Sequence, residues 1–240
     1  MSLEAIGTIG NFDFTILYDD FDRNRFLRSI IYTMSISSAC IVISTTLGLW
    51  LALVYHSGRR IPRLLIGGFV AIFRNTPPLI QLYFFFFGVG AFFGGLFEGS
   101  LVISATTWAV IAISVYITAF NIESFRAAIT GLPSGCFEAA HALALPRYLI
   151  LFKITIPLTI RAVLPSLTNN LVELIKATSY AYTIAVPEIL YVSSQIWADE
   201  LNVVEMMIVM FVTYSALIGC LIYFMKSLEK KLALPGYGAS

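Results

Sequence analysis

Charge is what this sequence has least of. Only 12% of its 240 residues are Asp, Glu, Lys or Arg, whereas 58% are hydrophobic and the mean hydropathy is +0.85. Soluble globular domains carry roughly a quarter charged residues. The deficit argues against an ordinary soluble domain and predicts an all-α integral membrane protein, in which one membrane domain accounts for the whole length.

Other absences narrow the class further. The net charge is only +1 and no block of basic residues could follow a phosphate backbone, so no nucleic-acid partner is expected. The three cysteines are far apart and lack metal-ligand spacing, which makes them small apolar residues rather than metal ligands. His56 and His141 have no partners at catalytic spacing and are interpreted as loop residues. Without a triad, a carboxylate pair or a phosphate-binding glycine loop, a membrane-bound enzyme is disfavoured.

Long apolar runs take the place of these features. A membrane helix needs about 20 mostly apolar residues. Met1 to Asp22 has no basic n-region, so no signal peptide is predicted and the first span is expected to be retained. A four-span alternative places residues 154–185 at the interface, because they carry three charges and two prolines, with Pro187 just beyond them. The five predicted spans are Ile30 to Tyr55, Leu64 to Phe87, Leu101 to Ile122, Leu158 to Ser179 and Met206 to Met225.

Lys and Arg placement predicts the orientation, since cytoplasmic loops are enriched in both. Ten basic residues lie on one set of loops, whereas Gly88 to Gly99 and Ala185 to Glu205 have none. Residues 1–27 are then an extracytoplasmic segment with the N-terminus outside, although Arg23, Arg25 and Arg28 count against this. Residues 28–230 form the transmembrane domain, with a cytoplasmic loop at 123–156 and a cytoplasmic tail at 231–240.

The loop at 123–156 is long and organised by prolines. Pro133 and Ser134 can open a helix, because Ser is a favoured N-cap and Pro is tolerated near a helix start. We expect one short helix over Gly135 to Leu145, stopped by Pro146.

A second short helix is expected from Arg147 to Lys153, with Pro157 bending the chain into the next span. Two short helices at an angle make a compact knob. Such a knob can fit a cleft on a partner and carry motion across an interface.

The residues of this loop resemble the EAA loop of permease subunits in bacterial ABC importers. The family pattern is E-A-A, three residues, Gly, nine residues and I-x-L-P. Ala lacks the freedom of Gly to adopt positive φ, so the sequence does not by itself favour a tight turn at Ala144. The matching positions are Glu138, Ala139 and Ala140, then Ala144 in place of Gly, then Ile154, Ile156 in place of Leu, and Pro157, with Gly135 fitting the approach to the loop.

Two further stretches narrow the resemblance to importers of the histidine, glutamine, glutamate and arginine type. Residues 73–82, F-R-N-T-P-P-L-I-Q-L, resemble the R-G-T-P-x-x-x-Q segment, with Asn75 in place of Gly. Residues 164–169, L-P-S-L-T-N, and 174–179, L-I-K-A-T-S, resemble the LPxLTN and LxKxTS stretches. The resemblance covers about residues 28–230.

The resemblance implies a permease of the binding-protein-dependent type in the bacterial cytoplasmic membrane. It would pair with itself or with a sister permease, and a cytoplasmic ABC ATPase dimer would grip the knob. ATP and Mg²⁺ would belong to that ATPase, because the chain has no G-x-x-x-x-G-K-[ST] motif and binds no cofactor itself. An extracytoplasmic solute-binding protein would deliver a polar amino acid.

Polar residues at membrane depth are candidates for the substrate path, because charges there usually face a cavity or a partner. Arg74 is expected near the middle of the second span, either near a substrate carboxylate or in an ion pair with Glu123 or Glu173. Asn169, Glu173 and Lys176 are spaced i, i+4 and i+7 and share a helix face. They could complement an amino acid, or Glu173 and Lys176 could pair at a dimer interface. The full candidate set is Arg74, Asn75, Gln81, Asn169, Glu173 and Lys176.

Two other features have plainer interpretations. Glu123 and Arg126 are expected to anchor the knob at the cytoplasmic end of the third span. The aromatic run at 83–87 is expected to face lipid near the interface. The alternative to an ABC permease is a self-sufficient secondary amino-acid transporter or channel. Such transporters usually have two related halves, and no convincing internal repeat is visible here.

Overall fold

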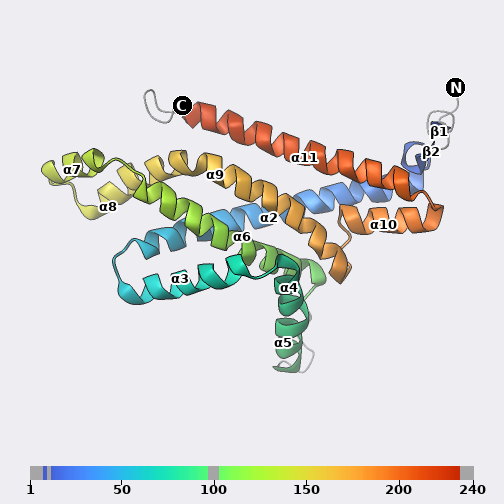
Figure 1. Ribbon diagram of the computed structural model, residues 1–240, viewed down its shortest axis with the longest axis horizontal. Coiled ribbons are helices and arrows are strands. Elements are labelled where there is room, and N and C mark those ends of the chain that lie inside the picture. Colours follow the sequence, from blue (N-terminus) through green and yellow to red (C-terminus); the bar gives the residue numbers. More distant parts are fainter. Residues whose placement is uncertain (1–7, 10–11, 97–102, 233–240) are drawn as a thin grey trace. The chain divides into compact units, whose positions relative to one another are not determined.

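The computed structural model describes residues 8–9, 12–96 and 103–232, and these residues are almost entirely helical (Figure 1). A two-residue pairing of β1 (Thr8–Ile9) with β2 (Phe12–Asp13) is antiparallel. A 3-10 turn, Thr15–Leu17, follows it. The α-helices are α2 (Asp20–Tyr55), α3 (Arg60–Asn75), α4 (Pro78–Tyr83), α5 (Gly90–Leu96), α6 (Ala105–Thr130), α7 (Ser134–Ala142), α8 (Arg147–Leu149), α9 (Ile156–Ala177), α10 (Ile189–Glu200) and α11 (Val203–Leu232).

Five helical stretches of the described residues are long and apolar enough to cross a membrane, which confirms the predicted all-α membrane protein with five spans. Each exceeds or nearly reaches the length of about 20 residues that a bilayer requires. The first span starts earlier than predicted, because α2 is already helical at Asp20. Leu101 and Val102, the predicted start of the third span, lie outside the described residues. The five stretches are Asp20–Tyr55, Pro78–Leu96, Ala105–Thr130, Arg147–Ile184 and Val203–Leu232.

The predicted second span, Leu64 to Phe87, is wrong. The chain is helical from Arg60 to Asn75, breaks at Thr76 and Pro77, and crosses as Pro78–Leu96. A π-helical segment, Phe84–Val89, joins α4 to α5 within this span. The break has a local cause, since Pro77 has no N–H and is extended at ψ 134°. Arg74 therefore ends α3 instead of lying in the middle of a span.

The chain does not leave the helix at Pro157. Arg147–Ile184 is one continuous helical stretch, in which α8 passes through a π-helical segment, Ile150–Thr155, into α9. A 3-10 segment, Thr178–Ile184, closes it. In a regular α-helix the Pro157 ring would meet the carbonyl four residues earlier. A π-helical turn is wider and can accommodate the ring. Prolines and π-helical turns bend helices, and in Figure 1 the ribbon changes direction between α8 and the later part of α9.

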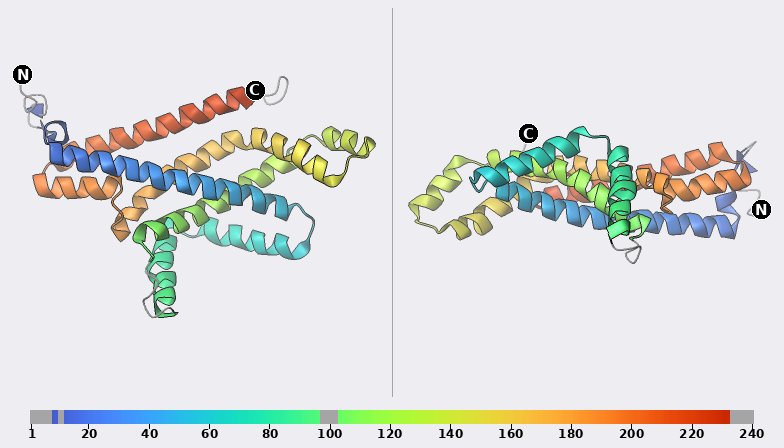
Figure 2. Two further views of the ribbon diagram at one scale, coloured as in Figure 1. Left: turned by 180° about the vertical axis from the view of Figure 1, so that it is seen from behind. Right: turned by 90° about the horizontal axis from the view of Figure 1, so that it is seen from below.

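Contacts divide the chain into two compact units, and the long helices contribute to both. The first unit comprises the described residues of Met1–Val42, Thr76–Ser114 and Glu173–Cys220. Its core joins Phe26 of α2 and Met206 of α11 to α10, which lies beside both helices (Figure 2). The sequence predicts a loop over residues 185–205, but most of this stretch is the helix α10. Its buried residues Ile189, Val192, Ser193 and Ile196 recur at i, i+3, i+4 and i+7, the signature of an amphipathic helix.

Glu188 begins α10 as a fully buried N-cap. Its carboxylate accepts hydrogen bonds from the N–H groups of Leu190 (2.9 Å) and Tyr191 (2.8 Å) and from the Tyr214 hydroxyl (2.9 Å). Capping satisfies N–H groups that a helix start otherwise leaves without acceptors. The hydroxyl of Thr33 on α2 accepts from the Ile189 N–H at 3.1 Å. These bonds join α2, α10 and α11 through polar groups that are out of water.

The N-terminal turn is fastened to the same unit. The N–H of Asp13 donates to the Glu205 carboxylate at 3.0 Å, and Asn202 donates to the Thr15 hydroxyl at 3.0 Å. Residues almost 200 positions apart in sequence thus hold the first described segment against the start of α11. The Asp13 carboxylate accepts from the Tyr18 hydroxyl at 2.7 Å and raises the pKa of that hydroxyl to about 12.

The second unit comprises the described residues of Ile43–Asn75, Val115–Val172 and Leu221–Ser240. Ile66 and Val70 of α3 pack with Ile122 of α6 and with the end of α2. Gly48 lets α2 and α6 approach closely, because a Cβ at Gly48 would lie 2.6 Å from the Asn121 Cβ. Within this unit α6 and α9 run side by side towards α7 and α8 (Figures 1 and 2).

We expect the stability of the first unit to fall as pH rises from about 5 to 7. Burial raises the pKa of Glu188 from 4.5 to about 7, against the hydrogen bonds that lower it. The folded state thus holds this proton more tightly than the unfolded chain. Its contribution is full below pH 4.5 and is lost as pH approaches 7. At most about 3 kcal/mol is at stake, since one pKa unit equals about 1.4 kcal/mol.

The thermal unfolding midpoint in detergent, measured across this pH range, checks the expectation. Glu188→Gln cannot titrate and should flatten the slope. Glu200→Gln removes an exposed carboxylate at the other end of α10 and should keep the slope of the unaltered protein. An unchanged slope in Glu188→Gln contradicts the assignment.

Candidate functional site

The insert between α6 and α9 forms a short helical hairpin built from α7 and α8 (Figure 1). Pro133, at φ −61° and ψ 129°, precedes α7, which starts at Ser134. Ser134 is therefore the first helical residue rather than the predicted N-cap, and no side chain caps this end. Pro146 is extended in the same way and precedes α8. The two prolines delimit the hairpin as the sequence predicted, because each disfavours a helical conformation in the residue before it.

Ala144 adopts the left-handed conformation at φ 52°. The N–H of Leu145 donates to the Ala140 carbonyl at 3.1 Å, and the N–H of Ala144 donates to the His141 carbonyl at 2.9 Å. This pair of bonds is a Schellman motif, whose turn position is usually Gly. The tight turn that the sequence did not favour at Ala144 is thus present. Ala144 occupies it at a cost of about 1–2 kcal/mol, typical for an L-residue in this region.

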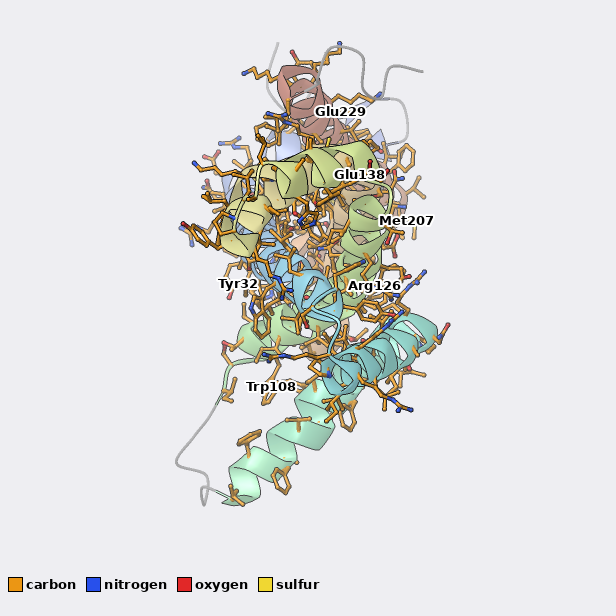
Figure 3. All side chains as sticks on the ribbon, turned by 90° about the vertical axis from the view of Figure 1, so that its left-hand side faces the viewer. Tyr32, Trp108, Arg126, Glu138, Met207 and Glu229 are labelled. Atoms are coloured by element: carbon orange, nitrogen blue, oxygen red, sulfur yellow. The ribbon has the colours of Figure 1, made fainter. Side chains whose placement is uncertain are left out.

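The two faces of α7 differ in exposure. Ala140 is buried at 2%, whereas Gly135, Glu138 and Ala139 are exposed. Figure 3 labels Glu138 on this helix. Ala140 thus anchors α7 while Glu138 stays free to meet a partner. Of the other predicted coupling residues, Ile154, Ile156 and Pro157 are half-buried in the helix that leads away.

The hairpin also exposes large apolar side chains that the sequence analysis did not single out. Leu143 is 73% exposed, and Tyr148 and Phe152 are each 62% exposed. Apolar groups in the middle of an interface, with charges at its rim, are what a docking surface offers. Their position beside an EAA-like helix is the signal that could have identified them.

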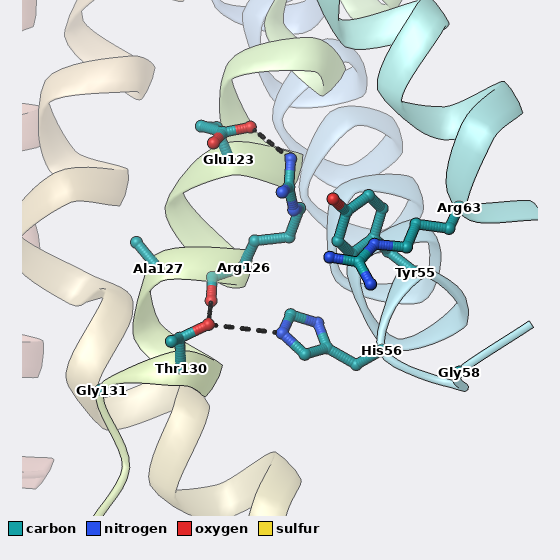
Figure 4. Close-up of a pocket in the computed structure, with 9 residues that line it drawn as sticks. All are labelled: Tyr55, His56, Gly58, Arg63, Glu123, Arg126, Ala127, Thr130 and Gly131. Carbon is teal, nitrogen blue, oxygen red and sulfur yellow. Dashed lines mark hydrogen bonds and ion pairs between the residues drawn. The ribbon is translucent and has the colours of Figure 1, made fainter. Parts of the chain in front are cut away.

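A cleft of about 580 Å³ lies where α2 and α6 end and α3 begins (Figure 4). Arg126 donates to the Glu123 carboxylate at 2.8 Å, and its guanidinium lies 3.6 Å from the centre of the Tyr55 ring. Arg63 of α3 lies over the same ring at 5.1 Å. Glu123 and Arg126, predicted to anchor the knob, thus pair with each other, and Arg126 also lies over the Tyr55 ring.

Both histidines predicted to be loop residues line clefts. His56 lies 3.4 Å from the Thr130 hydroxyl in the 580 Å³ cleft, and Thr130 donates to the Arg126 carbonyl at 2.9 Å. A second cleft of about 370 Å³ is lined by His56, by His141 of α7 and by Arg147 of α8. His56 follows α2 in a turn, but His141 is helical, which corrects its predicted loop position.

The candidate substrate-path residues differ in what they contact. Arg74 lies 5.2 Å from the centre of the Phe120 ring, and the salt bridges of the described residues pair Glu123 and Glu173 with other cations. Asn75 donates to the Ala71 carbonyl at 2.7 Å, within its own helix.

Gln81 is buried at 4% exposure and has an evident structural role. Its side chain donates to the Thr76 carbonyl at 2.8 Å. Thr76 stands in the helix break that Pro77 causes, so Gln81 satisfies one carbonyl that the break removes from the regular helical pattern.

On α9, Asn169 is exposed, and Glu173 and Lys176 form an ion pair at 3.8 Å. The neighbouring residue, Asn170, makes the interhelical contacts. It donates to the Asn121 side chain at 3.0 Å and to the Ser124 hydroxyl at 2.9 Å, both on α6. Asn121, fully buried, donates in turn to Ser44 of α2 at 3.3 Å. The sequence has two adjacent asparagines, Asn169 and Asn170, and nothing in it indicates which one faces α6.

Chains of known type resemble this one over most of its length. Residues 44–234 match the family described as "Binding-protein-dependent transport system inner membrane component". "Probable amino-acid ABC transporter permease protein YckA" of Bacillus subtilis is 33% identical over 86% of this chain and 88% of its own. "L-cystine transport system permease protein TcyB" of the same organism is 31% identical over 72% and 71%. The nopaline permease NocM of Agrobacterium fabrum is 30% identical over 82% of both chains.

Solved structures share the fold. A chain from an amino acid ABC transporter crystallised with histidines has a TM-score of 0.75 at 22% identity, covering 87% of this chain and 94% of its own. A chain of the inward-facing MetNI methionine ABC transporter has a TM-score of 0.74 at 16% identity, covering 90% and 100%.

The five helical spans with a proline-bounded hairpin between the third and fourth define a multi-pass membrane permease. The chain belongs to the binding-protein-dependent permease family of bacterial ABC transporters, in its polar amino-acid branch. It is thus the permease subunit of an ABC importer for amino acids and not a self-sufficient secondary transporter. Subunits of this family do not themselves hydrolyse ATP. Membership implies ATPase and binding-protein partners.

We expect Ala144→Gly to stabilise the hairpin by about 0.5–1 kcal/mol. Gly adopts positive φ without the steric cost that Ala has, but part of this gain is lost because Gly gives up more conformational entropy on folding. Ala139→Gly is the matched control, since Ala139 is exposed inside α7. It should destabilise the helix by about 1 kcal/mol. Hydrogen exchange of the α7 amides, followed by mass spectrometry, measures both. Equal effects of the two substitutions contradict a left-handed turn at Ala144.

Proposed function

We propose that α7 is the coupling helix of this importer and docks into a cytoplasmic ATPase dimer. The support is the division of its faces: Ala140 is buried, and Glu138 and Leu143 are exposed on a hairpin closed by two prolines. A rigid projection with a charged and apolar outer face suits a partner that must push and pull it. ATP and Mg²⁺ then bind to the ATPase, and this chain binds neither.

This proposal determines the topology. If the hairpin is cytoplasmic and the spans number five, the N-terminus is extracytoplasmic and the C-terminus cytoplasmic in the bacterial inner membrane. The basic residues near the hairpin and in the tail agree with that orientation. Residues 123–156 and the tail at 231–240 would face the ATPase side, and residues 1–27 the side of the solute-binding protein.

A second permease subunit, identical or related, completes the path. The outer faces of α11 and of the α4–α5 span support such pairing or lipid contact, because Ile80, Phe84, Phe211 and Phe224 are exposed. Tyr83, Phe84 and Phe87 of the predicted lipid-facing run are among the exposed side chains.

The proposed substrate is a polar amino acid, whose ammonium and carboxylate require opposite charges. On α9, Glu173 and Lys176 supply both charges on one side of a helix at 3.8 Å, and both side chains are at least 40% exposed. An ion pair this open can exchange its partner for a ligand at small cost. Asn169 lies one turn before Glu173 on the same helix, and Arg74, at the end of α3, is a separate candidate for the path.

Charge reversal at the hairpin tests coupling. Glu138→Lys should leave the complex assembled but lower amino acid transported per ATP hydrolysed by about tenfold or more, because like charges at an interface cost several kcal/mol. Uptake and ATP hydrolysis of the full complex in proteoliposomes give this ratio. Glu229→Lys makes the same change at an exposed site on α11 and should not alter it. Unaltered coupling in Glu138→Lys contradicts the docking role.

Neutralising Glu173 tests the path separately. Glu173→Gln should raise the KM of uptake about tenfold or more, since a hydrogen bond to a charged group contributes about 1.5–3 kcal/mol. The amount of assembled complex should stay unchanged, and Glu229→Gln is the control. If KM is unaffected while assembly is lost, the pair is purely structural.

A further inference from the structure

The cleft at the ends of α2 and α6 carries more positive charge than its own carboxylate can neutralise. Two arginines and a histidine line it, and Glu123 is its only acidic lining residue. The salt bridges of the described residues use Glu123 for Arg126 and none of them involves Arg63. Arg59 and Arg60 precede Arg63 at the start of α3 and add to the positive potential.

The two guanidinium groups are held in place before any ligand arrives. Both lie over the Tyr55 ring, Arg126 at 3.6 Å and Arg63 at 5.1 Å from its centre (Figure 4). Arg126 is fixed further by Glu123 at 2.8 Å, and its Nε is buried and has no acceptor among the described residues. A planar guanidinium offers forked N–H donors that match phosphate oxygens, and a preordered fork loses less entropy on binding.

The position of the cleft fits a ligand at the membrane surface. It lies at the ends of two candidate spans, Asp20–Tyr55 and Ala105–Thr130, where lipid headgroups begin. Basic residues at that depth attract anionic lipids by about 1 kcal/mol each. Its volume of about 580 Å³ lies within the range of small-molecule sites and can hold a phosphate ester.

We propose that this cleft is a binding site for a phosphate oxyanion, with Arg63 and Arg126 as its direct ligands. His56 and Thr130 form the neighbouring wall and can add hydrogen bonds. The oxyanion can come from the headgroup of an anionic phospholipid or from a soluble phosphate compound. Because Arg63 and Arg126 lie outside α7, the site is independent of the coupling role of α7.

The test uses the purified permease with its partner subunits in a neutral detergent. The thermal unfolding midpoint is followed against increasing dihexanoyl phosphatidylglycerol, dihexanoyl phosphatidylcholine or inorganic phosphate. Saturable stabilisation by the phosphatidylglycerol alone supports a lipid headgroup site. Saturable stabilisation by inorganic phosphate supports the same site with a soluble ligand. If neither the phosphatidylglycerol nor inorganic phosphate stabilises the complex saturably, the proposal is overturned.

Two neighbouring arginines make the test specific. Arg63→Gln should raise the apparent Kd about fivefold, the scale of one lost basic contact near a membrane surface. Arg60→Gln removes the same charge from the same turn of α3 but does not line the cleft, so its Kd should stay within about twofold of the unaltered protein. Arg63→Lys keeps the charge, loses the fork and should fall between them. Equal losses in Arg60→Gln and Arg63→Gln overturn the proposal, because they indicate a diffuse basic surface.

Discussion

A backbone that crosses lipid must satisfy its own hydrogen bonds, and this constraint decides where the chain can be irregular. The interruptions therefore bring their own hydrogen-bond partners. At the Thr76–Pro77 break, the side chain of Gln81 donates to the carbonyl of Thr76. Before α10, the Glu188 carboxylate caps the helix, and at Ala144 the Schellman bonds replace the lost helical ones. Polar side chains such as Gln81 and Glu188 thus satisfy backbone groups, so their presence alone does not indicate a ligand site.

Polar side chains buried between helices also find hydrogen-bond partners in one another. Asn170 and Asn121 connect α9 to α6, the two helices that lead into and out of the hairpin, and Ser44 adds α2. Gly48 permits the close approach that these short side chains need. These bonds tie the two helices that flank the hairpin to each other within their unit.

In the basic cleft at the ends of α2 and α6, one aromatic ring positions two charged side chains. The guanidinium groups of Arg126 and Arg63 both lie over the Tyr55 ring, whose negative π face attracts cations. The ring thus holds two like charges in one small volume. A phosphate oxyanion is the natural complement, and it would also join the ends of α2 and α6 to the start of α3.

By itself, the sequence determined that the protein lies in a membrane, that it has five spans and that a proline-bounded helical hairpin follows the third. These properties depend on composition and on local spacing, because hydropathy and proline act on their immediate neighbours. Only the tertiary structure decided that Asn170 rather than Asn169 faces α6, that Arg74 ends a helix outside the spans, and that α10 is buried behind Glu188. It also showed Ala144 in a conformation that Ala disfavours. The bonds of Asn170 and Glu188 join residues far apart in sequence, which no local pattern records. At Ala144 the Schellman bonds offset a preference of about 1–2 kcal/mol.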